Sequence, residues 1–369
     1  MFPMIMVALL LVGTMISKIS PLEIIASPSM TTRLGGVKIP ASLWEQEALI
    51  HVKALDGMLY PPGECLKTRQ HLVKTHPIYN FLHTYYRYSA KNLRFYSPGI
   101  DVVLEAEKGT STSDSRSSSS SSSSSSKRKK ESHVSQLDPK YLHVSNDECC
   151  SYILPPMASI DPSSPFGWIT LSRNRDLLMN TASRAPFFGC FGYHEWAMLY
   201  SGRNKGLSEP LPLHQKEVPL RVTQDVIDDV VETMGLRCTH YDAYRFFHPS
   251  VQPLNIVHPL TRTNQIEHEQ SGCVHAAMDL FKYAYTIYPF ISSSLLRACV
   301  NVALTARKLD MRASPYDTTN VLYCGPPICV ETLEGRNQYQ EEQKSLALEA
   351  TIIREQLIQG YNLVLSKLQ

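Results

Sequence analysis

Hydrophobic residues recur at helical spacing along much of the chain, and this pattern predicts a mostly helical protein. Residues 42–55 form the first such stretch, and Gly57 is predicted to end that helix. Residues 224–234 form a second amphipathic stretch, which Gly235 is predicted to end. The last stretch, residues 334–369, predicts a long carboxyl-terminal helix.

Shorter segments carry the β-branched and aromatic residues that are typical of strands. Three such segments are residues 101–105, 140–144 and 151–156. A further strand is predicted at residues 236–247. Successive side chains alternate across a strand, so His240 and Asp242 are expected to share one face of it.

Helices are predicted on both sides of Pro289, at residues 273–288 and 295–309, and together they are expected to form an antiparallel hairpin. The expected fold class is α+β and mostly helical overall. In this fold a small mixed sheet, which includes residues 236–247, is covered by the helical hairpin and by the long carboxyl-terminal helix. The chain shows no internal repeat.

Ionisable residues lie among apolar and aromatic residues in this part of the chain, where an unpaired charge is costly. We hypothesise that four of them converge on one pocket: His240, Asp242, His275 and Asp279. Glu195 and Arg312 are predicted to lie near its rim. The alternative is that these side chains form two separate networks that only brace the core.

The composition divides the chain into a leader, a folded part and an insertion. Residues 1–35 are a leader, which is excluded from the fold. Residues 36–106 and 138–369 are predicted to form a single globular domain. Between them, residues 107–137 contain an unbroken run of serines and are predicted to be a disordered insertion.

The leader has two interpretations. Phe2 to Ile16 carry no charge, which fits the core of a signal or organelle-targeting segment within residues 1–20 but is short for a membrane span. Alternatively, the segment is an extension of a gene whose true start is Met30. No stable membrane span is expected.

The nine cysteines are odd in number and irregularly spaced, which argues against a disulfide framework. Free thiols favour an intracellular location, in the nucleus or an organelle, over the secretory route. The net charge of +2 gives no global signal for a polyanion, so DNA binding would need a local basic patch. The chain has no glycine-rich nucleotide loop and no Gly-x-Ser-x-Gly elbow.

Nitrogen and carboxylate groups typical of iron, manganese or zinc sites are plentiful, so a divalent metal is a candidate cofactor. The metal-ligand candidates are His194, His240, His275 and Asp279. The pair His194-Glu195 resembles the start of a zinc-protease helix, but Met198 stands where that motif requires its second histidine. A zinc-protease helix is therefore excluded.

Five long segments resemble a family found in bacteria and some eukaryotes that is labelled 3-methyladenine DNA glycosylase. The segments are HPIYNFLHTYYRYSAKNLRFYSPG, FGCFGYHEWAMLY, RCTHYDAYRFFHPSVQPLN, EQSGCVHAAMDLFKYAY and ARKLDMRASPYD. The resemblance covers about residues 39–339 and implies an enzyme that releases an alkylated purine from DNA.

Under the function that this resemblance implies, the damaged base is flipped out of the duplex and stacks on an aromatic residue such as Tyr244. Asp242 or Asp279 would stabilise the sugar cation or activate water. The full set of catalytic candidates is Asp242, Asp279, His240, His275 and Glu195. The substrate-binding candidates are Tyr244, Asn255 and the phosphate-binding Arg245, Arg262 and Arg312.

The sequence leaves three function classes open. They are a DNA glycosylase, a metal-dependent hydrolase or oxygenase that acts on a small molecule, and a non-catalytic binding protein. Metal analysis of the purified protein separates the first two classes. The substrate and the oligomeric state stay open.

Overall fold

The computed structural model describes residues 37–61, 73–105, 136–145, 149–202 and 217–368. The predicted leader, 1–35, lies outside the described residues, and so does nearly all of the predicted insertion, 107–137. Leu137 is described and is buried in the core, so the folded part resumes before residue 138. Residues 38–369 form one compact unit, and apart from the first residue of β1 all the elements below lie in it.

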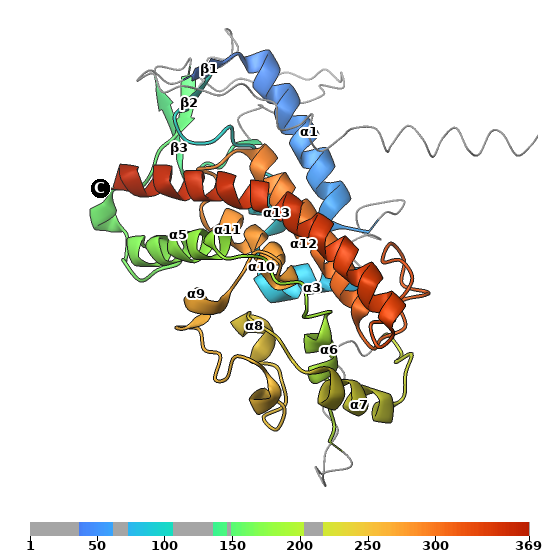
Figure 1. Cartoon of the computed structure of the whole chain (residues 1–369). Helices are drawn as coiled ribbons and strands as arrows, with labels where there is room; N and C mark the ends of the chain where they lie inside the picture. Colours follow the sequence, from blue (N-terminus) through green and yellow to red (C-terminus); the bar gives the residue numbers. More distant parts are fainter. Residues whose placement is uncertain (1–36, 62–72, 106–135, 146–148, 203–216, 369) are drawn as a thin grey trace, which may run out of the picture. The chain divides into compact units, whose positions relative to one another are not determined.

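The chain is α+β and mostly helical, as predicted (Figure 1). The strands are β1 (Val37–Ile39), β2 (Val102–Glu105), β3 (Leu142–Ser145) and β4 (Cys149–Tyr152). The α-helices are α1 (Ala41–Leu59), α3 (Pro77–Tyr86), α4 (Ala90–Leu93), α5 (Trp168–Ser183), α6 (Tyr193–Ala197), α7 (Gln224–Met234), α8 (Tyr241–Tyr244), α9 (Gln265–His268), α10 (Val274–Met278), α11 (Leu280–Thr286), α12 (Ser293–Ala313) and α13 (Leu333–Leu368). None of the described helices is both long enough and apolar enough to cross a membrane.

The predicted hairpin is present, with α10 and α11 on one side of the turn and α12 on the other. Asp279 keeps a nearly helical backbone between α10 and α11, so the two form one almost continuous arm. Ser292 caps α12, since its hydroxyl accepts a hydrogen bond from the backbone N–H of Leu295 at 3.2 Å. The contacts of α12 with α6, α10, α11 and α13 make it the central helix of the fold.

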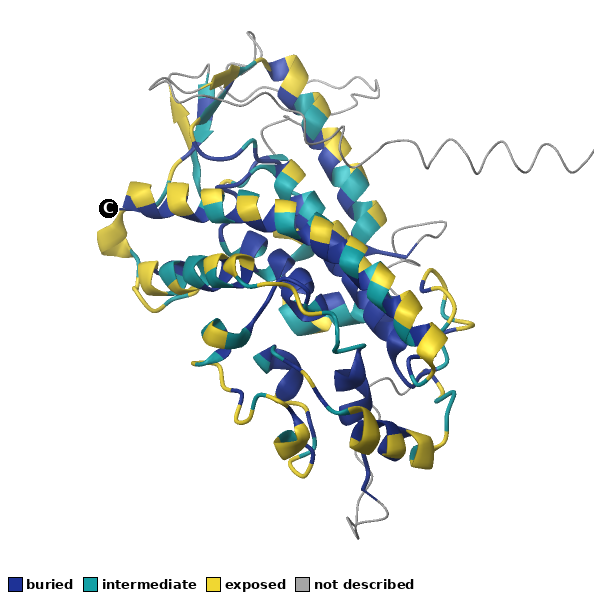
Figure 2. Ribbon diagram, in the orientation of Figure 1, coloured by how far each residue is buried: buried dark blue, intermediate teal, exposed yellow. Residues whose placement is uncertain are grey.

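The long helix α13 packs along α12 and α5. Figure 2 shows that α13 is buried along one face and exposed along the opposite face. The inner face of α12 carries small residues such as Cys299, Ala303 and Ala306, all fully buried, which lets neighbouring helices approach closely. Larger apolar residues of α13, including Leu357 and Val364, complete this core.

The sheet is small, with the strand order β1-β2-β4-β3. Strand β4 pairs antiparallel with both β2 and β3; for example, Leu104 is opposite Cys150. The sheet lies beside α1, where the Trp44 indole donates a hydrogen bond to the Glu105 carbonyl at 2.9 Å. None of the candidate site residues lies on these strands.

Residues 236–247 do not form a strand, and this prediction was wrong. The segment makes one isolated bridge, between Leu236 and Asn255, and then turns into the short helix α8. The Asn255 side chain bonds both the backbone N–H and the carbonyl of Cys238, at 2.7 and 2.9 Å. A side chain therefore takes the place of a neighbouring strand. Because His240 precedes α8 and Asp242 lies within it, the two do not share a strand face.

Two glycines were predicted to end helices, and one of these predictions is wrong while the other is confirmed. Gly57 does not end α1, which continues to Leu59, and a Cβ atom at Gly57 would meet nothing within 4 Å. Gly235 does end α7, with the positive φ of 74° that glycine tolerates. The stop at Gly57 was inferred from residue type alone, whereas apolar Leu55 and Leu59 on the buried face hold α1 together past the glycine.

Candidate functional site

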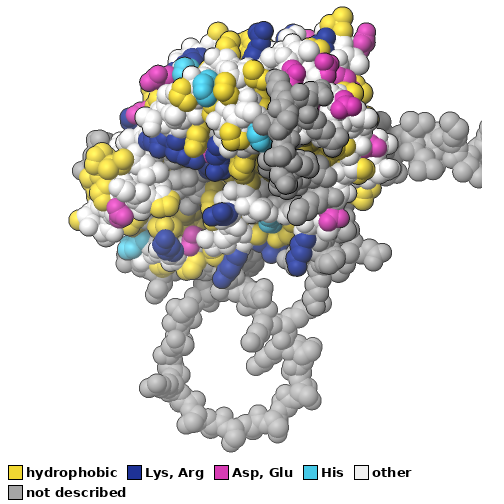
Figure 3. Space-filling model, turned by 90° about the horizontal axis from the view of Figure 1, so that it is seen from below, with side chains coloured by type: hydrophobic (Ala, Val, Ile, Leu, Met, Phe, Trp, Pro, Cys, Tyr) yellow, Lys and Arg dark blue, Asp and Glu magenta, His cyan; other side chains and the backbone are white. Residues whose placement is uncertain are grey.

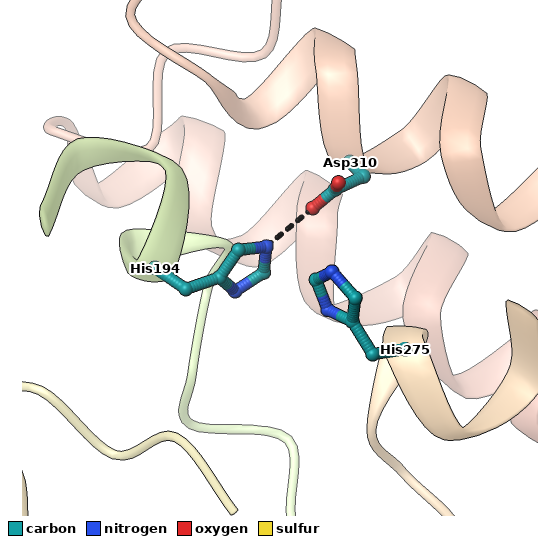
Figure 4. Close-up of side chains that lie close together, drawn as sticks. All are labelled: His194, His275 and Asp310. Atoms are coloured by element: carbon teal, nitrogen blue, oxygen red, sulfur yellow. Dashed lines mark hydrogen bonds and ion pairs between the residues drawn. The ribbon is translucent and has the colours of Figure 1, made fainter. Parts of the chain in front are cut away.

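Two buried histidines and one buried aspartate meet where α6, α10 and α12 come together (Figure 4). His194 comes from α6, His275 from α10 and Asp310 from the last turns of α12. Each offers one ligand atom, and these three atoms lie within 4.8 Å of one another. Among the described residues this is the one group of histidine, cysteine or carboxylate side chains that meets this distance.

Helix α6 reaches this position because of a glycine. Gly192 immediately precedes α6 with a φ of 73°, a conformation that disfavours residues with a Cβ atom. A Cβ atom there would also lie 2.9 Å from Cβ of Ala313. The turn therefore brings α6 against the end of α12, where the Trp196 indole donates to the Ala313 carbonyl at 2.9 Å. This contact fixes the position of His194.

His194 and Asp310 form a fully buried ion pair, with 2.6 Å between Nε2 and Oδ1. Burial lowers the pKa of His194, but the Asp310 carboxylate outweighs it and raises that pKa well above its ordinary value. Burial likewise raises the pKa of Asp310, but His194 and its other partners hold it far below the usual range. Without a metal the pair is therefore an imidazolium beside a carboxylate.

His275 differs from His194 although the ring centroids are only 4.5 Å apart. Burial and the neighbouring charge of His194 lower the pKa of His275 well below its ordinary value, so it is neutral at pH 7. Its Nδ1 is buried and has no hydrogen-bond partner among the described residues. Figure 4 shows the nitrogen-bearing edge of the ring turned toward His194 and Asp310.

The second carboxylate oxygen of Asp310 accepts a hydrogen bond from Arg307 Nη1 at 2.7 Å. The same nitrogen donates to Glu195 Oε1, also at 2.7 Å. Glu195 is therefore buried and held by an ion pair, rather than at a rim as predicted. Burial raises the pKa of Glu195 above its ordinary value in spite of Arg307. Arg307 holds the two carboxylates together and fixes the orientation of Asp310.

His240 extends the cluster on the other side of His275. The two rings are stacked, with centroids 5.3 Å apart. His240 Nε2 lies 3.3 Å from Asp279 Oδ2 without the geometry of a hydrogen bond. Burial lowers the pKa of His240, but the Asp279 carboxylate raises it above the ordinary value. Asp279 in turn pairs with Lys282, and burial fails to raise its pKa because Lys282 and His240 lower it.

Asp242 lies farther out and does not touch the histidines. Its Oδ1 accepts hydrogen bonds or ion pairs from Arg262 at 2.9 Å and from Arg245 at 3.1 Å. The Lys282 ammonium lies 3.6 Å from Oδ2 of Asp242 and also forms an ion pair with Asp279. Lys282 therefore links the two aspartates. The structure thus brings together His240, His275 and Asp279, and places Asp242 at their edge.

Three predicted substrate-binding residues make contacts within the protein instead. The Tyr244 hydroxyl lies 2.7 Å from His258 Nδ1, and Asn255 braces the backbone of the preceding loop. Arg312 pairs with Glu342 of α13. Arg312 follows Asp310 by two residues, which is about 200° around a helix, so it points away from the site.

Two central residues, Asp310 and Arg307, are absent from the predicted set. A signal for both was present in the sequence. They lie on the apolar stripe of α12 that contains Cys299, Ala303 and Ala306, where a charged residue requires a buried partner. Charged residues on the buried face of a helix would have pointed to the site more directly than the alternation of residues 236–247.

A narrow cavity of about 10 Å³ adjoins His194. Its lining combines the exposed Arg237 with three cysteines, of which Cys238 is buried and Cys190 and Cys273 are partly buried. Cys190 Sγ lies 3.7 Å from His194 Nδ1. Burial raises the pKa of the Cys238 and Cys273 thiols, so both are protonated at neutral pH. The cavity has room for about one water molecule.

Comparison with known proteins finds no matching family model, no matching curated protein and no matching solved structure.

Proposed function

We propose that the protein is a metal-dependent enzyme that acts on a small molecule, with His194, His275 and Asp310 as the ligands of one divalent cation. The observation that carries this proposal is the buried, unpartnered Nδ1 of His275 beside the His194–Asp310 pair within the described part of the chain. Two histidines and one carboxylate are a donor set typical of non-haem iron, and they also suit manganese and zinc.

A purely structural network accounts less well for this arrangement. Buried polar atoms in a structural network normally have hydrogen-bond partners, because each unsatisfied group costs about 1–3 kcal/mol. The Nδ1 atoms of His275 and His240 lack such partners among the residues that the structure describes. A cation bound by His275 would satisfy its open ring nitrogen, and the neutral state of this ring is the state that binds metals.

The surrounding residues have distinct tasks under this proposal. Arg307 and Glu195 orient Asp310 from behind, as the outer partners of metal ligands commonly do. Binding of the cation replaces the proton of His194, so metal uptake releases a proton and weakens at low pH. The cation would supply either an activated water for hydrolysis or a site for oxygen chemistry.

DNA glycosylase activity is a second candidate function. Asp242 favours it, because this carboxylate lies among the exposed cations Arg245 and Arg262 and could act beside a phosphate backbone. The two functions differ in one respect that can be measured. Release of 3-methyladenine by metal-free protein, unaffected by a chelator, supports the glycosylase.

Metal content is the direct test of the first proposal. The protein is purified, loaded without oxygen with Fe²⁺, Mn²⁺ or Zn²⁺, desalted and analysed for bound metal. We expect about one equivalent in the wild type and a loss of at least tenfold in affinity for His275→Gln and Asp310→Asn. His51→Gln is the matched control, since His51 is equally buried but binds Leu93 and Arg297 elsewhere. Equal metal content in all four proteins would refute the metal centre.

A further inference from the structure

A groove of about 310 Å³ lies between α5, α9 and α11. Small-molecule sites have volumes of about 300–1,000 Å³, so the groove could accept a compact ligand. Figure 3 shows Lys and Arg side chains gathered on the face of the molecule that is seen from below. The groove is lined by Ser163, Ile169, Thr170, Arg173, Asn174, Leu177, Arg262, Gln265, Lys282 and Tyr283.

The charged groups in this lining are all positive. Arg173, Arg262 and Lys282 contribute to the wall, and no aspartate or glutamate of the described residues does. Asp242 and Asp279 pair with Arg262 and Lys282 respectively, but neither aspartate lines the groove. An anion in the groove would therefore meet three cations without a carboxylate in the lining.

The three cations are held in place before any ligand binds. Asp242 accepts from Nη2 of Arg262 at 2.9 Å, which uses one of the five donors of a guanidinium. Arg173 donates to the carbonyl of Arg262 at 2.7 Å, so the two arginines are fixed relative to each other. No carboxylate of the described residues pairs with Arg173, which leaves its charge uncompensated within that part of the chain.

We propose that this groove binds the oxyanion group, a phosphate or a carboxylate, of a small-molecule ligand. Arginine pairs recognise such groups through parallel N–H donors, and the hydroxyl and amide side chains of Thr170, Asn174 and Gln265 offer further hydrogen bonds. Ligand binding here costs little reorganisation, because Asp242 and Asp279 already hold two of the cations.

This inference rests on the proposed function in one respect: it makes the bound anion part of the substrate. A continuous series of contacts links the groove to the metal ligands. Lys282 pairs with Asp279, Asp279 lies beside His240, and the His240 ring stacks on His275. An anion bound next to Lys282 would therefore lie at one end of a series of ionisable groups that ends at the metal ligand His275.

The test is calorimetric titration of the metal-free full chain with inorganic phosphate, with acetate in a parallel experiment, at low ionic strength. We expect saturable binding of one anion per chain. Arg173→Gln and Arg262→Gln should each weaken it about tenfold, the loss expected for one charge-assisted contact. Arg245→Gln is the matched control, since Arg245 binds the same Asp242 oxygen but does not line the groove. The stronger of the two probes identifies the oxyanion.

Three results would overturn the inference: no binding of either anion, equal weakening in Arg245→Gln, or an affinity for a single-stranded oligonucleotide that exceeds both and depends on Arg245 as much as on Arg262. Metal content is measured in parallel on aliquots of the same protein that have been loaded with Fe²⁺, Mn²⁺ or Zn²⁺ and desalted. Metal without anion binding refutes the groove and leaves the metal centre. Anion binding without metal refutes the metal centre and leaves the groove as an anion site.

Discussion

Two neighbouring histidines differ in protonation state in this protein because their partners differ. His194 faces the Asp310 carboxylate and is protonated, whereas His275 faces His194 and is neutral. Two adjacent imidazoliums would repel each other, so the His194–His275 pair carries one positive charge, which is on His194. One proton and one open nitrogen make a site that can exchange the proton for a metal ion.

His51 is another buried histidine, outside the cluster, and both of its ring nitrogens have hydrogen-bond partners in the neutral form. Its Nε2 donates to the Leu93 carbonyl at 2.8 Å, and Arg297 Nη1 donates to its Nδ1 at 3.2 Å. A proton on Nδ1 would face the donor nitrogen of Arg297. Burial, with a contribution from Arg297, lowers the pKa of His51 to about 4.

His51 should make stability depend on pH in a defined window. Between pH 6.5 and about 4 the unfolded chain binds a proton at His51 that the folded chain does not. The unfolding free energy should therefore fall as pH falls through this window, with a contribution of about 3 kcal/mol from His51. We expect urea unfolding to show a shallower pH dependence for His51→Gln than for the wild type. Identical slopes would contradict the assignment.

At the scale of elements, helices were predicted better than the connections between them. The stripe of α12 and the end of α7 follow from residues close in sequence, such as Leu296, Val300 and Gly235, and a local pattern is enough to specify them. Residues 236–247 show the opposite case. Their alternation fits a strand, but the side chain of Asn255, which lies outside this segment, satisfies the backbone instead.

Helix α13 begins against a loop that leaves no space for a side chain at Gly335. A Cβ atom there would collide with the carbonyl group of Cys329. Gly335→Ala must therefore displace the start of α13 or the loop, because a backbone atom cannot rotate away. Gly57 provides the contrast, since it lies exposed within α1 and a Cβ atom added to it would meet nothing within 4 Å.

We expect the two substitutions to have opposite effects. Gly335→Ala should lower the unfolding free energy by more than about 2 kcal/mol, in the range of overpacked or strained sites. Gly57→Ala should raise it by about 0.5–1 kcal/mol, because alanine is the better helix former. Chemical denaturation of both variants measures the difference. A stabilising Gly335→Ala would contradict the close contact between the start of α13 and the Cys329 loop.

At the scale of the whole molecule, the candidate site draws on segments that are distant in sequence. His194 and Asp310 are separated by 116 residues, and His275 lies between them. The sequence indicated which part of the chain carries buried ionisable residues, and His240, His275 and Asp279 do lie together. The position of Asp310 on the apolar stripe of α12 indicated that it has a buried partner, but not that the partner is His194, because this pairing depends on the turn at Gly192 and on the packing of α6 against α12.

A metal bound by α6, α10 and α12 should stabilise the whole fold, because the unfolded chain does not hold these three ligands together. At a concentration of about one hundred times the dissociation constant, binding adds about 2.7 kcal/mol, which corresponds to a rise of about 4 °C in Tm for a chain of this size.

We expect the wild type to show this rise with Zn²⁺ or Mn²⁺ and to lose it again on addition of a chelator. His275→Gln should show no rise, since it lacks one of the three ligands. Mg²⁺ serves as the control ion, because it prefers oxygen ligands and should bind neither protein at this site. The measurement is a thermal unfolding scan at matched ion concentrations. A rise of the same size in His275→Gln would place the bound ion elsewhere on the chain, and a rise with Mg²⁺ alone would argue for a site built from carboxylates rather than from His194 and His275.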